Sequence, residues 1–367
     1  MPPSSLDRPD ARRRPRPGCA QDGDRALRSG RLRRAGDRAA PNGGGARMSD
    51  APYRLTDRGD TRLLSVGSRE YATRYSERVI RMLIARKGLG RTPPYLSYKE
   101  TRGAHYLGPF FRYLRAQGLG KLKVLEVGCS FGHMTEYLCD QPEVDTIHAF
   151  DTDAAFVEIA RAKVDEMRLA KVREVALFTN DQTRRLPYED GAFDAVLAIG
   201  VVEHLPPARR SQVDEYYRVL APGGHIAILD TPNRWFPLET HSVGLPLVQW
   251  LPPGLAHRYA RALRPRRFGA VPYADFVADG TGWRNATLAE CLPSSGWRGL
   301  TDVTEEAGYG WRFFNDTARS STRRALLPVF AVLCAAARAV GQPPSVCLPY
   351  LNMLLLKSVA SEPRPWR

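Results

Sequence analysis

The chain has 367 residues, 43% of them hydrophobic, and a net charge of +15. That length suffices for one large domain with additions, and a basic balance fits either nucleic acid or an anionic membrane surface. The six cysteines show no paired spacing and no CxxC, which argues against a disulfide framework or a zinc site and favours free thiols in the cytoplasm.

Residues 1–47 differ from the rest of the chain. They hold twelve Arg, five Asp and very few large apolar residues, so their net charge is +7 and the remainder carries 15 − 7 = +8. Such a segment cannot bury enough surface to offset its ordering entropy, and we expect a disordered tail. It has no apolar run of a secretory signal, its Asp residues argue against a transit peptide, and Met48 is an alternative start.

Residues 48–120 are predicted to be helical. Two apolar stripes at helical spacing support this prediction, each followed by glycine. The first contains Tyr71, Tyr75, Val79 and Met82, and the second contains Tyr106, Phe110 and Leu114. We expect these helices to pack on the edge of a sheet.

A strand, a glycine turn and a helix follow in residues 123–139. The apolar residues of 124–127 are typical of a buried parallel strand, which breaks at Gly128-Cys-Ser-Phe-Gly132. In this order, backbone N–H groups and a helix N-terminus face a ligand. The next strand, 146–151, ends in Asp151, which lies 151 − 132 = 19 residues after the last glycine. That spacing is close to the roughly 20 residues expected before an acid that binds ribose hydroxyls.

Two features distinguish this loop from a nicotinamide-binding loop: Glu126 precedes the first glycine, and Ser130 replaces the middle one. An acid at this position would repel a pyrophosphate but suits a cationic ligand. The sequence here resembles the class I S-adenosylmethionine (SAM) methyltransferases, whose first motif is an acid-x-Gly-x-Gly-x-Gly loop. The resemblance extends to about Asn233, and more loosely to the C-terminus.

The resemblance implies SAM as the cofactor and an α/β fold. That fold is a Rossmann-like, doubly wound, seven-stranded sheet, mostly parallel with the last strand antiparallel, with N-terminal helices and a cap insertion after the fifth strand. It also implies that the N-terminal helices cover the cofactor, as an alternative to simple packing. The residues expected to bind SAM in this half are Glu126, Gly128, Cys129, Ser130, Gly132, Asp151 and Thr152.

After the third strand, 175–178, the chain resembles the family's block of Asp, Leu-Pro-Phe and Phe-Asp. In that block the acid accepts a hydrogen bond from the adenine amino group. Asp181, with Gln182 beside it, is the match. Asn180 is a rival, because one extra residue precedes Leu186.

The fourth strand ends in Gly200-Val-Val-Glu203-His204-Leu205, which resembles an element of the methyltransferase group called type 11. We expect Gly200 to bind the cofactor, since ligands bind at the carboxyl ends of such strands. The Asn/Asp-Pro-Pro-Tyr element of enzymes that methylate exocyclic base nitrogens is absent here, which disfavours a base-modifying enzyme. Pro222-Gly-Gly224 then leads into the fifth strand, 226–230.

Residues 234–283 are predicted to form a cap that selects the substrate. Aromatic residues alternate with arginines in this segment, which suits a membrane interface with a lipid-linked acceptor, stacking on RNA bases or sugars, or a small core with a solvated basic face. The aromatics are Trp235, Phe236, Trp250, Tyr259, Phe268, Tyr273, Phe276 and Trp283, and the arginines are Arg258, Arg261, Arg264, Arg266 and Arg267.

Residues 284–367 are expected to complete the sheet. Thr287-Leu-Ala-Glu290 fits a capping box that opens a helix, and residues 351–356 fit the last strand. Residues 325–337 form an uncharged run of 13, shorter than the roughly 20 needed to span a bilayer. A buried or an interfacial helix is expected there.

Transfer of a methyl group from SAM to a hydroxyl requires alignment of the reactants and a base with a pKa near neutral. His204, at the pocket mouth, is the first candidate base, His241 in the cap is the second, and Glu203 completes the candidate catalytic set. No metal is assigned, although these three residues and Glu239 could together bind a divalent cation, as some quinone O-methyltransferases that the chain resembles require.

The leading hypothesis is a cytoplasmic SAM-dependent O-methyltransferase that acts on a hydroxyl of a lipid-linked, glycan or polyketide-like acceptor. Peripheral contact with the inner face of the membrane is part of this hypothesis. The alternatives are a quinone-ring methyltransferase and an RNA-binding or non-catalytic SAM-binding protein. A nucleic-acid partner is not favoured, and the sequence does not define an oligomeric state.

Overall fold

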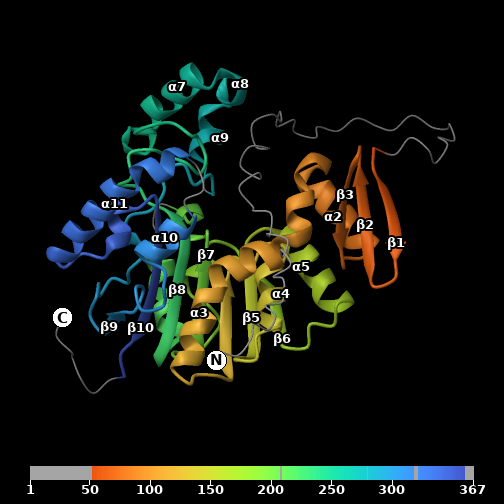
Figure 1. Cartoon of the computed structure of the whole chain (residues 1–367), viewed down its shortest axis with the longest axis horizontal. Helices are drawn as coiled ribbons and strands as arrows, with labels where there is room; N and C mark the ends of the chain where they lie inside the picture. Colours follow the sequence, from red (N-terminus) through yellow and green to blue (C-terminus); the bar gives the residue numbers. More distant parts are fainter. Residues whose placement is uncertain (1–51, 207–208, 279, 318–320, 360–367) are drawn as a thin grey trace, which may run out of the picture.

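The computed structural model describes residues 52–206, 209–278, 280–317 and 321–359 (Figure 1). The predicted tail, residues 1–47, lies outside these ranges. A seven-stranded sheet forms the centre of the molecule, in the order β6-β5-β4-β7-β8-β10-β9. The strands are β4 (Leu122–Val127), β5 (Val144–Asp151), β6 (Val172–Leu177), β7 (Phe193–Ile199), β8 (Leu220–Pro232), β9 (Leu300–Asp302) and β10 (Tyr350–Lys357).

The strand directions confirm the predicted fold class. Strands β4 to β8 pair in parallel, while β10 runs antiparallel to both β8 and β9. Helices cover both faces: α3 (Ala104–Ala116), α4 (His133–Cys139), α5 (Ala154–Glu166) and α6 (Arg210–Val219). In β7, Ala195 and Leu197 join the core cluster that includes α3, and Val196 and Ala198 join the cluster that includes α6. Alternate residues therefore face opposite layers, as a strand buried on both sides requires.

The N-terminal segment corrects one prediction, because residues 48–120 are not helical throughout. The segment begins with a three-stranded antiparallel sheet. Gly59 and Gly67 have φ values of 64° and 58°, and they form the tight turns between its strands. Helix begins only after Ser76, whose side chain accepts from the N–H of Val79. The elements are β1 (Arg54–Arg58), β2 (Thr61–Val66), β3 (Arg69–Thr73), α2 (Glu77–Lys87), the short helical turns η1 (Leu89–Arg91) and η2 (Pro93–Ser97), and the π-helical turn η3 (Lys99–Gly103).

A buried polar network joins this N-terminal segment to the sheet domain. Nζ of Lys163, a fully buried residue of α5, lies 2.9 Å from Oε2 of Glu136 in α4. Tyr75 bridges the two, since its hydroxyl donates to Glu136 and accepts from Lys163, at 2.9 Å each. Lys99 of η3 pairs with Asp140 at 2.7 Å and approaches Glu136 at 3.7 Å. The N-terminal segment thus supplies partners that two buried charges require.

The rest of the chain forms a cap and a C-terminal helical layer. The cap contains η6 (Val248–Trp250), α7 (Pro253–Leu263), α8 (Pro265–Phe268) and α9 (Tyr273–Val277), with a core cluster of its own that includes Ala256, Phe276 and Trp283. The capping box at Thr287 is confirmed, but it opens only the 3-10 turn η7 (Leu288–Glu290) instead of a helix. The layer that follows contains α10 (Trp311–Thr317), α11 (Ser321–Ala339) and the 3-10 turn η8 (Pro344–Cys347).

Replacement of Glu136 by Ala tests the buried network. We expect the free energy of unfolding to fall by about 3–5 kcal/mol, because the Lys163 ammonium would stay buried without its carboxylate. Urea denaturation measures the change. As a matched control, Glu77→Ala removes the carboxylate of the exposed Arg81–Glu77 pair and should leave the unfolding midpoint nearly unchanged. Equal effects of the two substitutions would show that the network does not stabilise the fold.

Candidate functional site

The glycine loop after β4 enters the left-handed region of backbone conformation at three positions. Gly128, Ser130 and Gly132 all have positive φ, at 68°, 49° and 73°. A Cβ at Gly128 would lie 2.6 Å from Cγ2 of Val201, and a Cβ at Gly132 would lie 3.2 Å from Cβ of Ala160. The two glycines are therefore required by packing against the end of β7 and against α5, in addition to any approach of a ligand.

Asp151 holds this loop in place from the end of β5. Its Oδ2 accepts from the N–H of Ser130 at 2.7 Å, and its Oδ1 accepts from the N–H of Asp153 at 2.9 Å. Each carboxylate oxygen still has acceptor capacity for a second donor, which suits the ribose hydroxyls of a nucleoside. Burial is the main influence on the group and raises the pKa of Asp151. The predicted ribose-binding acid is thus also the residue that orients the loop.

Glu126 lies buried below the loop, where Oγ1 of Thr135 donates to its Oε2 at 2.6 Å. Burial raises the pKa of Glu126 to about 8. A cationic ligand would stabilise the ionised carboxylate, so this environment fits the sulfonium-bearing SAM expected from the sequence. Together with the Asp151 acceptors, the residues present fit that cofactor.

Two of the predicted cofactor residues have side chains committed elsewhere. The Cys129 side chain is buried in a cluster that includes Val157, and its N–H donates to the carbonyl of Phe150, so neither group is open to a ligand and its predicted role in binding stays a prediction. Oε1 of Gln182 accepts from the N–H of Thr179 at 2.8 Å and thereby closes the turn before η4 (Gln182–Arg184).

Three predictions on this side of the sheet stay predictions. The side chain of Asp181 is 89% exposed and reaches Arg184 at 3.7 Å, a position open to an adenine ring. Its rival Asn180 and the residue Thr152, beside Asp151, are also exposed. No contact among the residues that the structure describes selects among them.

The candidate catalytic residues come together at the carboxyl end of β7. The 3-10 turn η5 (Val202–His204) carries Glu203 and His204. Nε2 of His204 lies 3.1 Å from Nε2 of His241, and Oε1 of Glu203 lies 3.9 Å from Nε2 of His204. Gly200, at φ 65°, adopts the left-handed conformation that favours glycine, and a Cβ on it would be in ordinary contact with Oε1 of Glu203, at 3.7 Å.

Glu239 has a role different from the one considered for it. Its Oε1 accepts from the N–H groups of His241 and Ser242 at 2.7 Å each, and its Oε2 accepts from Gly244 at 2.8 Å and from Val243. A fully buried carboxylate with four backbone donors has no capacity left for an ion. Glu239 therefore shapes the turn that presents His241.

An ion pair that was not predicted from the sequence joins the N-terminal segment to this edge of the sheet. Arg102 of η3 pairs with Asp230 near the end of β8, and Tyr106 lies beneath the guanidinium, with its ring centroid 5.3 Å away. Burial is the main cause of the raised pKa of Tyr106, and Asp230 adds to it. No motif marks Arg102, but the position of Asp230 at the carboxyl end of a parallel strand was a usable signal.

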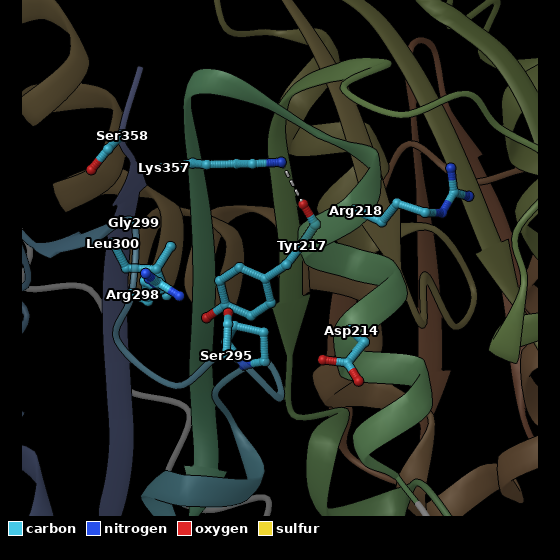
Figure 2. Close-up of a pocket in the computed structure, with 10 residues that line it drawn as sticks. Asp214, Tyr217, Arg218, Ser295, Arg298, Gly299, Leu300, Lys357 and Ser358 are labelled. Carbon is cyan, nitrogen blue, oxygen red and sulfur yellow. Dashed lines mark hydrogen bonds between the residues drawn. The ribbon is translucent and has the colours of Figure 1, made fainter. Parts of the chain in front are cut away.

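A separate cavity lies between the end of α6 and the end of β10 (Figure 2). None of its lining residues belongs to the predicted site. Its Lys357 donates to the carbonyls of Tyr217 and Leu220, at 2.8 and 2.6 Å, and its Arg218 pairs with Glu215 and Asp190. Lys357 and Arg218 therefore already have partners within the chain.

Part of the chain is similar to known methyltransferases. Residues 125–228 match the model of a methyltransferase domain family. The chain is 30% identical over 182 residues to a probable tRNA methyltransferase 9B of Bos taurus, over 48% of this chain and 35% of that protein. It is 33% identical over 112 residues to methyltransferase GfsG of Streptomyces halstedii, over 30% of this chain and 38% of the relative. It is 28% identical over 164 residues to a demethylmenaquinone methyltransferase of Lactococcus lactis, over 44% and 62% of the two chains. The aligned region is little more than a third of the length of the first two relatives.

Substitution of Asp151 by Ala should weaken SAM binding by about 1–3 kcal/mol, because the ribose hydroxyls lose a charged acceptor and the loop loses its tie at Ser130. Calorimetry measures the affinity. Asp153→Ala is the matched control. Oδ1 of Asp153 accepts from the N–H groups of Ala155 and Phe156, so the substitution removes the N-terminal cap of α5. The control should lower stability by about 0.5–2 kcal/mol but affect SAM affinity less. Equal affinities for the two variants would contradict the role of Asp151.

SAM affinity should also depend on pH through Glu126. With a pKa of about 8 in the free protein, the carboxyl is mostly protonated at pH 7, and the bound cation favours its ionised form. Affinity should therefore rise with pH, by up to about tenfold per unit, and level off above the pKa of the free protein. Calorimetric titrations of wild type and Glu126→Gln at matched pH isolate the effect. Identical pH profiles for the two proteins would contradict it.

Proposed function

We propose that this chain, of which residues 125–228 match a methyltransferase domain family, is a class I SAM-dependent methyltransferase that transfers a methyl group to a hydroxyl of a lipid-linked, glycan or polyketide-like acceptor. SAM supplies an electrophilic methyl group when bound. The glycine loop, Glu126 and Asp151 would hold the cofactor, and the acceptor would enter at the carboxyl edge of β7 and β8. A domain match and a site that fits the cofactor support this proposal.

The arrangement at the end of β7 supports a hydroxyl acceptor. Val201 packs against Gly128 of the cofactor loop, and Glu203 and His204 follow within three residues. Nδ1 of His204 lies 2.7 Å from the carbonyl oxygen of Gly280. A carbonyl oxygen only accepts, so Nδ1 carries the hydrogen and Nε2 of the neutral ring carries a lone pair. A polar cluster with proton-accepting atoms thus adjoins the cofactor loop, which a hydroxyl acceptor requires.

The exposed face of α11 supports a lipid-linked acceptor. This helix buries Phe330, Cys334 and Ala337 against neighbouring elements. Its opposite face exposes large apolar side chains to solvent: Leu326 at 45%, Val329 at 54%, Val332 at 69% and Leu333 at 44%. A helix that is apolar on both faces is unusual at a soluble surface and typical of an interfacial element.

The cap adds the charges that such an interface uses. In α7 the side chains of Leu255 and Leu263 are more than half exposed, and Arg258 and Arg261 are exposed on the same helix. Figure 1 shows α7 to α9 and α11 on one side of the molecule, away from β1 to β3. Apolar side chains beside arginines suit a surface with anionic headgroups. None of the helices in the described ranges is long and apolar enough to cross a membrane.

Two other acceptors are alternatives. Quinone-ring methylation draws support from the name of the demethylmenaquinone relative and would use the same exposed apolar surface. RNA draws support from the name of the tRNA methyltransferase relatives and from the exposed arginines of the cap. The exposed apolar row of α11 favours a lipid-like acceptor, because RNA offers such a surface nothing to bury.

Transfer of tritiated methyl from SAM into fractionated lipid, glycan and RNA extracts tests the proposal. We expect label in the lipid or glycan fraction, stable to ribonuclease, with the Asp151→Ala protein as the low-activity control. Label confined to ribonuclease-sensitive material would overturn the acceptor class. No label in any fraction, with SAM binding intact, would overturn methyl transfer itself.

Binding to vesicles tests the proposed interface. The protein should sediment with anionic vesicles at low salt, and the double substitution Val332→Ser, Leu333→Ser should reduce the bound fraction several-fold without changing SAM affinity. Leu119→Ser is the matched control, since Leu119 is similarly exposed, at 39%, but lies outside α11 and the cap. Replacement of Arg258, Arg261 and Arg266 by Ser should reduce binding to anionic but not neutral vesicles. No sedimentation of the wild-type protein at low salt would refute the interface.

A further inference from the structure

We propose that Glu203, His204 and His241 bind one divalent transition-metal ion at the carboxyl end of β7. The potential ligand atoms of these three residues all lie within 4.8 Å of one another. Metal binding by the cluster can be tested separately from methyl transfer, but a metal-bound Nε2 of His204 has no lone pair left for a proton, so the ion would replace this histidine as the group that activates the acceptor hydroxyl. Only its suggested purpose, to position an oxygen of the acceptor, rests on that proposed function.

The distances within the cluster are close to those around a metal ion. Two imidazole nitrogens at about 2.0–2.1 Å from one tetrahedral ion are separated by roughly 3.3 Å. Nε2 of His204 and Nε2 of His241 lie 3.1 Å apart. Oε1 of Glu203, at 3.9 Å from Nε2 of His204, needs only a slight inward rotation to complete a set of three ligands.

The second shell of the histidines fixes them in the form that a metal requires. Nδ1–H of His204 donates to the carbonyl of Gly280, which leaves Nε2 as the free donor atom toward the cluster. Metal-bound histidines commonly donate their other ring N–H to a carbonyl or a carboxylate in this way. Glu239 fixes the backbone of His241 through the N–H groups described above.

The loop that supplies Gly280 also holds both rings in position. A Cβ on Gly282 would lie 3.0 Å from Cε1 of His204 and 3.1 Å from Cδ2 of His241, so only glycine fits against the two imidazoles. Oγ of Ser242, beside His241, donates to the carbonyl of Thr281 at 2.8 Å. The cap and the sheet domain therefore hold the histidine pair jointly.

The buried carboxylate of Glu203 is the independent indication of a ligand. Its side chain has no exposed surface, and within the described residues neither carboxylate oxygen has a hydrogen-bond partner. A hydrogen bond between the two histidines would give both Nε2 atoms a partner, but it would still leave both carboxylate oxygens of Glu203 without one. Asp230, which faces the same region, is already paired with Arg102. A cation between Glu203 and the histidines would satisfy this carboxylate.

The ligand set determines the class of ion. Two imidazoles and one carboxylate suit Zn²⁺, Co²⁺ or Fe²⁺, whereas Mg²⁺ and Ca²⁺ prefer sites made only of oxygen atoms. Three protein ligands leave coordination positions open, as in catalytic zinc sites. His204 is partly exposed, with 39% of its side-chain surface accessible, so an ion and an oxygen-bearing acceptor can reach the cluster.

Co²⁺ titration of the chelator-treated, full-length protein tests the proposal through visible absorption, with calorimetry using Zn²⁺ as a second measurement. We expect one ion per chain, no displacement by millimolar Mg²⁺, and no charge-transfer absorption of a thiolate ligand. His204→Ala, His241→Ala and Glu203→Gln should each weaken Co²⁺ binding at least tenfold. His148→Gln is the matched control, because His148 lies 3.5 Å from Glu174, outside the cluster, and its loss should leave Co²⁺ affinity unchanged.

SAM affinity and thermal melting, measured without metal, establish that each variant is folded. The proposal would be overturned if wild-type protein that still binds SAM did not bind Co²⁺ and Zn²⁺ stoichiometrically. It would also be overturned if the His204→Ala, His241→Ala double variant bound Co²⁺ as tightly as wild type. The result is separable from methyl transfer. Asp151→Ala should lose SAM affinity but retain Co²⁺ affinity, and metal binding without any labelled acceptor would refute only the proposed function.

Discussion

Ser130 is held in the left-handed region of the backbone, at φ 49°, although it is not a glycine. Its N–H donates to Asp151 at 2.7 Å, so the energy of a charge-assisted hydrogen bond offsets the backbone strain. The same carboxylate accepts from Asp153 and so links the loop after β4 to the start of α5. The shape of the cofactor loop, and its contact with Val201 just after β7, thus depend on one acidic side chain at the end of β5.

The cluster at the carboxyl edge of β7 and β8 depends on a different constraint, since its residues come from segments far apart in the chain. His204 follows β7, whereas His241 and Gly282 belong to the segment between β8 and η7. Glu239 uses its whole carboxylate to shape the turn before His241. A buried carboxylate is stable only when it is fully hydrogen-bonded, so the position of His241 is fixed by the requirement of Glu239 for partners. Glu203 lacks such partners in the described residues, and this contrast supports a function for it.

The N-terminal segment and α11 bury their surfaces to different extents. The segment inserts Tyr75 and Lys99 among the charges of α4 and α5, and its position therefore depends on a network in which Glu136 and Lys163 are buried. Helix α11 buries one face against α10 and η8 and leaves the other face apolar and exposed. Burial of that face would release water from apolar surface, so a lipid surface is a suitable partner.

The sequence by itself determined the nucleotide half of the molecule. The run into Gly128 and the acid at Asp151 follow from local periodicity and from spacing along one βα unit, whereas the seven-stranded sheet was expected from the resemblance to the SAM methyltransferases. The sequence was less informative about the N-terminal segment, where turns decide the structure. The apolar stripe from Tyr71 to Met82 fits one helix as well as it fits a strand followed by a helix.

Only the tertiary structure decided which residues meet at the carboxyl edge of β7 and β8. The 3.1 Å approach of His204 and His241 and the pairing of Arg102 with Asp230 join residues 37 and 128 positions apart. Such contacts depend on where the cap and the N-terminal segment pack against the sheet, and no local sequence pattern encodes that packing. The same reason explains why Glu239 was considered a ligand and proved to be a structural residue: its four donors lie in a turn whose conformation the sequence does not specify.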